Sequence, residues 1–310
     1  MSTKGTADRI MLPNFVLAGA AKSGTSFLAS ALAEHSAVFV PSHKECSFFA
    51  FQNCHPRFTG PQDERMNRRI ITALPEYEKL FDRATCKHVT VGEASVYYLA
   101  RPKSFRRMRT LLGANCKILL VLRNPADRAF SGYGHYIRDG RETLSFADAI
   151  HHEEERLAAG WQDSWGYTRM SRYAPGVQAA FDAFGPSCVR IWTYEELRDD
   201  PARLVAEAFE FIGVDPSFTA RTDARVNASG APRSKLVQRL IDERHVLKKI
   251  WQPIVPAPIR GRVVQWIQNR NLRPLAFPED LRPYLNEGFH PDISTLSALT
   301  GRDFTPWTLS

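Results

Sequence analysis

One segment near the N-terminus restricts the possible folds more than any other part of the sequence. Phe15 to Ala18 is a short apolar run, which predicts a buried strand. A turn follows at Gly19 to Gly24, and apolar residues at helical spacing then continue to about Ala33. Glycines let the backbone approach an anion, and the first turn of a helix offers free N–H groups and a positive dipole end. The segment therefore predicts an anion-binding loop between a strand and a helix.

The order of residues in this loop differs from that of an ATPase loop. A Walker A sequence, G-x-x-x-x-G-K-[ST], places its lysine directly after the second glycine. Here Lys22 precedes Gly24 in the sequence Gly-Ala-Ala-Lys-Ser-Gly-Thr-Ser of residues 19–26. Two interpretations follow from the loop alone: an anion site of another class, or an ordinary βα turn with an exposed lysine.

Composition limits the class of protein. The chain has 310 residues, of which 44% are hydrophobic and 24% charged, as in an ordinary globular protein. No apolar run approaches the roughly 18 residues of a membrane span, and residues 1–10 lack the apolar core of a signal peptide, so we expect a cytoplasmic protein. The five cysteines are scattered without a C-x-x-C pair, which predicts reduced thiols and no zinc site.

The net charge of +8 favours a polyanionic partner. Nucleic acid, a nucleotide with several phosphates, and an acidic glycan or lipid head group are all compatible with that charge. Composition alone does not choose among them.

Strand and helix patterns alternate through the first 215 residues. Strands are expected near 15–18, 38–41, 88–95, 117–123 and 188–192, and helices near 25–33, 75–81, 102–112, 124–139, 145–155, 173–184 and 201–212. This alternation predicts an α/β fold with a mostly parallel central sheet and helices on both faces. We expect a flexible N-terminus at 1–12 and a single domain at 13–310. A basic helical segment at about 234–270 belongs to that domain, which closes with a helix near 279–299.

A second anion site is predicted at the end of the strand 117–122. Arg123 follows this buried strand, and Asn124-Pro125 then start a helix, because asparagine is a good N-cap and proline suits the first helical position. An arginine at such a point is poised to bind a phosphate. Its alternative role is to pair with a carboxylate at the sheet edge.

These segments together resemble the sulfotransferases that use PAPS (3′-phosphoadenosine 5′-phosphosulfate). Residues 22–26 are similar to the P-loop-like loop that binds the 5′-phosphosulfate. Residues 119–133 are similar to the motif in which an arginine, and a serine eight residues later, bind the 3′-phosphate; these are Arg123 and Ser131 here. Lys44-Glu45 followed by Phe48-Phe49 resembles glycan-type members, such as the heparan sulfate sulfotransferases. With further matches at 92–98, 194–214 and 296–307, the resemblance covers about residues 13–308.

The resemblance implies PAPS as sulfuryl donor, PAP as product and no metal. It implies these cofactor-binding residues: Lys22, Ser23, Gly24, Thr25, Ser26, Arg123, Ser131, Asn227 and Arg233. The last two lie where family members have a loop that closes over the cofactor, although the sequence departs there from the usual R-K-G or K-G-R patterns.

The resemblance also implies the catalytic roles. Lys22 would steady the leaving oxygen, Lys44 would stabilise the transferring sulfuryl group, and Glu45 would take the proton of the acceptor. Pairing with Lys44 at the surface is the alternative role of Glu45. Aryl and steroid sulfotransferases use a histidine base, so three histidines are rivals: His43, His55 and His135. Four residues are predicted to contact the acceptor: Glu93, Ser95, His43 and His135.

The leading hypothesis is a PAPS-dependent sulfotransferase that acts on a hydroxyl, or secondarily an amine, of a carbohydrate, glycolipid or secondary metabolite. We expect a small-molecule or glycan acceptor, no nucleic-acid partner and no transmembrane segment; the sequence specifies no oligomeric state. Acceptor loops are expected at about 46–70 and 135–172. In the second loop, three aromatic residues are expected to cover the core rather than to stack on a sugar: Trp161, Trp165 and Tyr167.

Two other classes stay open. A nucleotide kinase or NTPase is opposed by the missing Walker order and by the lack of an evident magnesium-binding carboxylate. A non-enzymatic polyanion-binding protein fits the charge but leaves the two anion loops unexplained.

Overall fold

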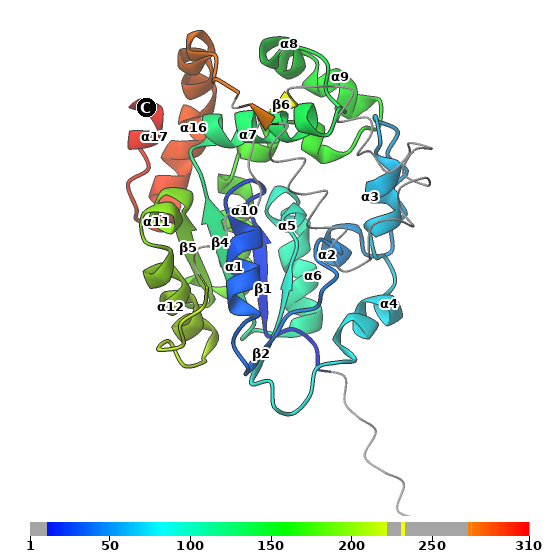
Figure 1. The fold of residues 1–310 in the computed structure, drawn as a ribbon, viewed down its shortest axis with the longest axis vertical. Helices are drawn as coiled ribbons and strands as arrows, with labels where there is room; N and C mark the ends of the chain where they lie inside the picture. The colour runs from blue at the N-terminus through cyan, green and yellow to red at the C-terminus, as the bar shows by residue number, and fades with distance from the viewer. Residues whose placement is uncertain (1–10, 222–230, 233–271, 274, 310) are drawn as a thin grey trace, which may run out of the picture.

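A five-stranded parallel sheet lies at the centre of the computed structural model, which describes residues 11–221, 231–232, 272–273 and 275–309 (Figure 1). The strand order is β2-β3-β1-β4-β5, and all four strand pairs are parallel. The strands are β1 (Phe15–Gly19), β2 (Val38–Phe39), β3 (Thr90–Ala94), β4 (Lys117–Leu122) and β5 (Val189–Thr193). The predicted α/β fold is confirmed, and the C-terminal ends of all strands meet at one edge.

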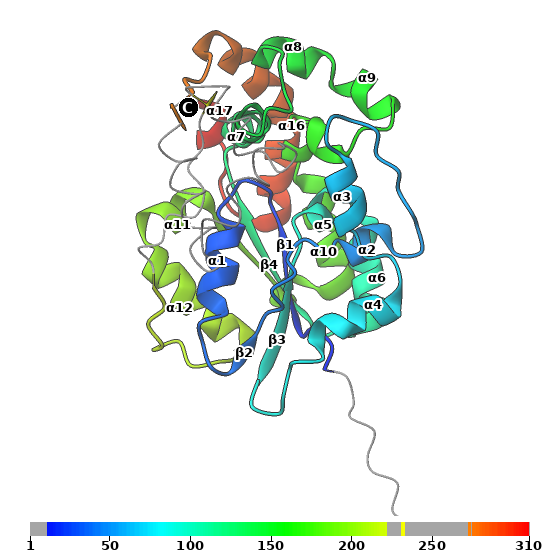
Figure 2. The same ribbon diagram turned by 45° about the vertical axis from the view of Figure 1, so that its right-hand side comes forward.

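Helices cover both faces of the sheet (Figure 2). The first layer holds α1 (Thr25–Leu32), α11 (Tyr194–Asp199) and α12 (Pro201–Ile212). The second layer holds α5 (Tyr97–Ala100), α6 (Lys103–Leu112), α10 (Ala174–Phe184) and α16 (Arg282–Thr300). Each layer packs a separate buried cluster against its face of the sheet. Both clusters form because β1 and β4 are apolar on both sides, as expected for central parallel strands.

The long helix α7 (Pro125–Arg138) crosses the C-terminal edge of the sheet (Figure 1). Its start is as predicted: the Asn124 side chain accepts hydrogen bonds from the N–H groups of Ala126 at 3.0 Å and Asp127 at 3.3 Å. The helix expected at 145–155 is instead two helices, α8 (Phe146–His151) and α9 (Glu153–Ala158), because the backbone at His152 turns to φ −91° and ψ 5°.

The segment 46–70, which is expected to be an acceptor loop, contains a short helix, α3 (Glu64–Arg69). It carries no apolar periodicity, but the buried carboxylate of Asp63 anchors its start. That carboxylate accepts hydrogen bonds from the backbone N–H and side-chain amide of Gln162 and from the indole of Trp165, about 100 residues away in sequence. Because these contacts join residues so far apart in sequence, no local sequence pattern predicts the helix.

The remaining elements are short. They are α2 (Phe48–Phe51), α4 (Leu74–Glu78), α17 (Pro306–Leu309), the antiparallel pair β6 (Ala231–Pro232) and β7 (Leu272–Arg273), and the 3₁₀ helices η1 (Lys79–Phe81), η2 (Asp163–Trp165), η3 (Arg169–Ser171), η4 (Pro186–Cys188) and η5 (Glu279–Leu281). Within the described ranges, no helix has the length and apolar character needed to cross a bilayer.

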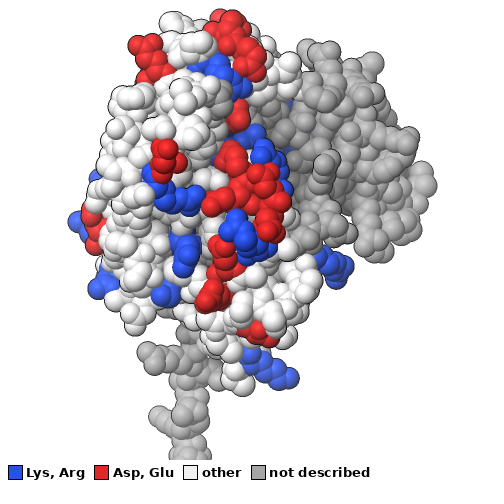
Figure 3. Space-filling model, turned by 90° about the vertical axis from the view of Figure 1, so that its left-hand side faces the viewer, with Lys and Arg blue, Asp and Glu red and all other residues white. Residues whose placement is uncertain are grey.

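The face formed by α11, α12 and the C-terminal helices carries charges of both signs (Figure 3). Acidic and basic side chains alternate there and pair, as in Arg203–Glu207 at 2.7 Å and Arg302–Glu196 at 3.0 Å. The positive net charge is therefore not displayed here as a continuous basic surface.

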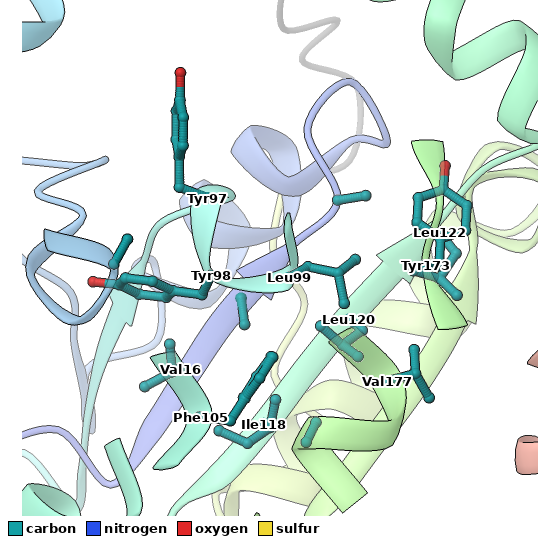
Figure 4. Packing of buried hydrophobic residues seen from close by; sticks show 14 of the residues in the cluster. Val16, Tyr97, Tyr98, Leu99, Phe105, Ile118, Leu120, Leu122, Tyr173 and Val177 are labelled. Carbon is teal, nitrogen blue, oxygen red and sulfur yellow. The ribbon is translucent and has the colours of Figure 1, made fainter. Parts of the chain in front are cut away.

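Part of the core between the sheet and the second helix layer is shown in Figure 4, where Val16 of β1 and Ile118 of β4 pack against Phe105 of α6. The adjacent Tyr97 and Tyr98 leave α5 in different directions. These two tyrosines consequently serve different polar networks at the sheet edge.

Candidate active site

The anion loop lies at the end of β1 and opens α1. Gly24 is the N-cap of α1 with a left-handed φ of 86°, and a Cβ there would lie 2.4 Å from Cδ2 of Leu197, so only glycine fits. Within the described part of the chain, no side chain caps α1 and its first turn holds no acidic residue. Ser23 is completely buried, and its Oγ has no hydrogen-bond partner. The loop thus presents donors that its own residues leave unused.

Lys22 projects from the same loop into a cationic environment. Burial and the charges of Arg138, Arg128 and Arg123 together lower the pKa of Lys22 to about 8, although Asp139 opposes them. Several positive charges therefore converge on the loop. A bound anion would relieve this repulsion.

Arg123 follows β4 and reaches the anion loop. Its Nη1 donates to the backbone oxygen of Lys22 at 3.2 Å, and its guanidinium lies 4.5 Å from the ring centre of Tyr194. Its Nε is buried without a hydrogen-bond partner. Among the residues described, no carboxylate forms an ion pair with Arg123, which argues against the alternative of a structural pair. Ser131, buried on α7, belongs to the same edge of the sheet.

Lys44 and Glu45 follow β2 and lie beside α1. Lys44 Nζ donates to Ser30 Oγ at 3.1 Å and to the Ser26 backbone oxygen at 3.4 Å, rather than to its neighbour Glu45. Burial lowers the pKa of Lys44, and Glu45 opposes this shift. The 44–45 segment is thus tied to the helix that carries the anion loop.

The carboxylate of Glu45 is held by the backbone. Its Oε2 accepts from the N–H of Val96 at 2.9 Å, and its own N–H donates to the Ala94 backbone oxygen at 2.9 Å. Burial, together with the negative charge of Glu93, raises the pKa of Glu45 to about 7. The Val96 N–H and the charges of Arg69 and Lys44 oppose it. A carboxylate with a pKa near neutrality suits a general base.

Behind Glu45, the carboxylate of Glu93 accepts hydrogen bonds from four buried side chains. The donors are Tyr98 Oη at 2.5 Å, Tyr77 Oη at 2.8 Å, Ser95 Oγ at 2.8 Å and Cys46 Sγ at 3.1 Å. Ser95 Oγ in turn accepts from the N–H of Ser47 at 3.1 Å. Glu93 is only 1% exposed and Ser95 is fully buried. Their predicted contact with the acceptor thus lacks support, because both side chains instead fix the segment that carries Glu45.

The rival histidines differ in surroundings. His43 is exposed and its Nε2 lies 3.2 Å from the Arg69 backbone oxygen, whereas His55 Nδ1 lies 3.1 Å from Thr72 Oγ1. His135 lies on α7 beside Arg138. Burial and then the charge of Lys22 lower the pKa of His135 to about 3, although Asp139 opposes this shift. A neutral imidazole close to Lys22 is therefore a stronger candidate for contact with a ligand than the other two.

A family model described as "Sulfotransferase domain" matches residues 12–230, which is more than two thirds of the sequence. The chain belongs to the sulfotransferase family.

Known sulfotransferases agree with this assignment. The crystal structure of a sulfotransferase from Alicyclobacillus acidocaldarius is 34% identical, with a TM-score of 0.74 over 96% of this chain and 99% of that chain. Membrane-associated sulfotransferase kil1 of Dictyostelium discoideum is 30% identical over 154 residues, 47% of this chain and 29% of that protein. Mouse bifunctional heparan sulfate N-deacetylase/N-sulfotransferase 3 is 26% identical over 229 residues, 70% of this chain and 24% of that protein. The sulfotransferase chain thus spans less than a third of these two curated relatives.

The structure brings most of the predicted site residues of this sulfotransferase to one edge of the sheet. Residues 22–26, Lys44, Glu45, Arg123, Ser131 and His135 all lie on segments that follow or cross the C-terminal ends of the strands. Asn227 and Arg233 lie outside the described residues, as do the segments 1–10 and 234–270. Trp165 and Tyr167 are completely buried, which confirms their prediction as core residues. The described residues of the sulfotransferase contain no group of three side chains suited to hold a metal.

Sequence reasoning missed the residues that support Glu45. No sequence motif marks the groups that hold Glu45 or Glu93 in place, which include the Val96 N–H, Tyr77 and Cys46. One signal was available: Glu93 is the single charged residue of the strand Thr90–Ala94, and a buried carboxylate requires donors around it.

Proposed function

We propose that this sulfotransferase moves a sulfuryl group from PAPS to a hydroxyl, or secondarily an amine, of a carbohydrate, glycolipid or secondary metabolite, with Glu45 as general base. The observation that carries this proposal is the position of Glu45, held by the Val96 N–H beside a lysine that is bonded to α1. That arrangement puts a proton acceptor near the anion loop. The cytoplasmic location stays a prediction.

The polar groups around the loop fit PAPS. PAPS supplies, when bound, an activated sulfuryl group on its 5′-phosphate and a separate 3′-phosphate. Ser23 Oγ and Arg123 Nε are buried donors without partners, and Lys22 is a cation repelled by its neighbours. Lys22, Ser23 and the N–H groups of residues 24–26 would hold the 5′ end, and Arg123 with Ser131 the 3′-phosphate. Anionic oxygens are the partners that such donors lack.

Three side chains have distinct roles in the proposed reaction. Lys22 would balance negative charge that develops on the leaving oxygen, and Lys44 would face the equatorial oxygens of the transferring group. One preorganised charge contact of this kind is worth roughly 10²–10³ in rate. Glu45 would accept the proton of the attacking hydroxyl, a contribution of typically ~10²–10⁴.

The alternatives have less support. A kinase or NTPase still conflicts with the order of Lys22 and Gly24. A polyanion-binding protein would leave the two anion loops unexplained. An amine acceptor stays as the second candidate because the mouse relative is named an N-sulfotransferase.

Thermal unfolding with PAP tests the cofactor directly. A ligand present at ~100 times its dissociation constant stabilises the folded state by about 2.7 kcal/mol, which is a rise of a few degrees in Tm for a chain of this size. We expect this shift with PAP in the wild type and its loss in Arg123→Ala. The exposed Arg109→Ala, on α6, removes the same charge elsewhere and should keep the shift. No shift with PAP, or a larger one with ATP–Mg²⁺, would contradict the proposal.

The affinity for PAP should fall as the pH rises above about 8, because Lys22 loses its proton there in the free protein. A bound phosphate favours the charged lysine, so binding above this pH takes up a proton, and affinity declines by up to about tenfold per pH unit. Phosphate monoesters have a second pKa of about 6, so they are already ionised above pH 8 and add nothing to the pH dependence of the affinity. Calorimetry in two buffers of different ionisation enthalpy measures this uptake. Lys22→Met should bind PAP more weakly and without proton uptake. If this variant takes up the same number of protons as the wild type, the proton goes to a group other than Lys22.

A further inference from the structure

The helix α7 holds a second arginine that neither the motif comparison nor the proposed mechanism uses. Arg128 is only 1% exposed. Its Nη1 donates to the Tyr167 backbone oxygen at 3.3 Å, but that oxygen also accepts from Ser171 Oγ at 3.0 Å. Its Nε is buried and has no partner. The protein therefore buries a guanidinium while using little of its hydrogen-bonding capacity.

The charge of Arg128 is also not neutralised by a contacting carboxylate. In the described ranges no acidic side chain forms an ion pair with it. The carboxylate that acts on it most strongly is Glu153, whose oxygens accept instead from the N–H and Oγ1 of Thr168, each at 2.7 Å. Burial lowers the pKa of Arg128, and the charge of Arg123 lowers it further. An unpaired buried charge is strongly unfavourable unless something compensates it.

The position of Arg128 indicates what compensates it. Arg128 and Ser131 are three residues apart on α7 and so lie on neighbouring positions of one helix face. The guanidinium also lies against Gly132, where a Cβ would be 2.7 Å from Nη2. It thus sits close to the serine that, with Arg123, forms the second anion constellation, and its charge acts on both Arg123 and Lys22.

We propose that Arg128 is a third cation of the nucleotide site, which strengthens binding of the 3′-phosphate beside Arg123 and Ser131. The inference rests on the proposed function, since the phosphate belongs to PAP. In the free protein no carboxylate of the described residues contacts this charge, and the bound phosphate would neutralise it. Gly132 leaves the space that the guanidinium occupies.

Arg128→Met separates this role from a structural one. Because a hydrogen bond to a charged group is worth a factor of about ten or more in affinity, we expect the Kd for PAP, measured by calorimetry, to rise at least about tenfold. The Tm without ligand should stay the same or rise, since an unpaired buried charge is replaced by an apolar side chain of similar length. A structural arginine would give the opposite pattern: a lower Tm and an unchanged Kd.

Gly132→Ala is the second variant, because it keeps the charge and displaces the guanidinium. Alanine favours the helix, which offsets the cost of moving the buried guanidinium, so the Tm should change little, while the Kd for PAP should rise. Arg109→Met, exposed on α6, is the matched control and should bind PAP as the wild type does.

The outcomes distinguish this inference from the proposed function. If the wild type itself does not bind PAP, both are wrong. If the wild type binds PAP and Arg123→Ala does not, while Arg128→Met and Gly132→Ala bind as the wild type, the inference about Arg128 alone is overturned.

Discussion

Glu45→Gln is expected to lower kcat by about 10²–10⁴ without weakening PAP binding. The amide has nearly the same shape and can still accept from the Val96 N–H, so the 44–47 segment should keep its geometry. What is lost is the ability to take a proton from the acceptor. Steady-state formation of PAP with an identified acceptor, beside PAP calorimetry on the same preparation, measures both quantities.

The pH profile identifies the base more sharply than the rate alone. Glu45 must be ionised to act, and its pKa is raised to about 7, so kcat/KM of the wild type should fall below that pH by about tenfold per unit. In Glu45→Gln this acid limb should disappear. His43→Gln, at an exposed position on the same segment, should keep it. If the limb persists in Glu45→Gln and is absent from His43→Gln, the base is the histidine.

The sheet and its order of elements could be predicted because their signals are local. The strand ending at Leu122 is continuously apolar, and Asn124-Pro125 mark the start of α7 with groups that satisfy its first N–H groups. Once strands and helices alternate, the parallel arrangement places every strand end at one edge. The anion loop and Arg123 could therefore be brought together from sequence alone.

The environment of Glu45 could not be predicted, because it depends on contacts between distant segments. Its hydrogen-bond donor, Val96, lies 51 residues away, and its raised pKa follows from burial by elements that pack only in the folded chain. Glu93 matched a motif and was predicted to contact the acceptor. The fold instead points its carboxylate toward Tyr77 and Tyr98, a direction that strand periodicity alone did not reveal.

Glu93→Ala is expected to be strongly destabilising, by about 3 kcal/mol or more, because four buried donors lose their common acceptor. For a chain of this size that lowers Tm by roughly 4–5 °C or more. Glu93→Gln should lose much less, since its amide oxygen still accepts and the tyrosine hydroxyls can reorient toward its NH₂ group. Glu76→Ala, at an exposed position of α4, is the control for loss of a carboxylate and should leave the Tm unchanged.

The Gln variant also shows whether Glu93 acts on the reaction through Glu45. Burial raises the pKa of Glu93, the four donors that converge on its side chain oppose this rise, and its negative charge contributes to the raised pKa of Glu45. Removing that charge while keeping the fold should move the acid limb of kcat/KM to lower pH. Glu76→Gln should not move it. If the acid limb stays at the same pH in a Glu93→Gln variant that is as stable as the wild type, Glu93 does not act on the pKa of Glu45. Its role is then only to hold the 44–47 segment in position.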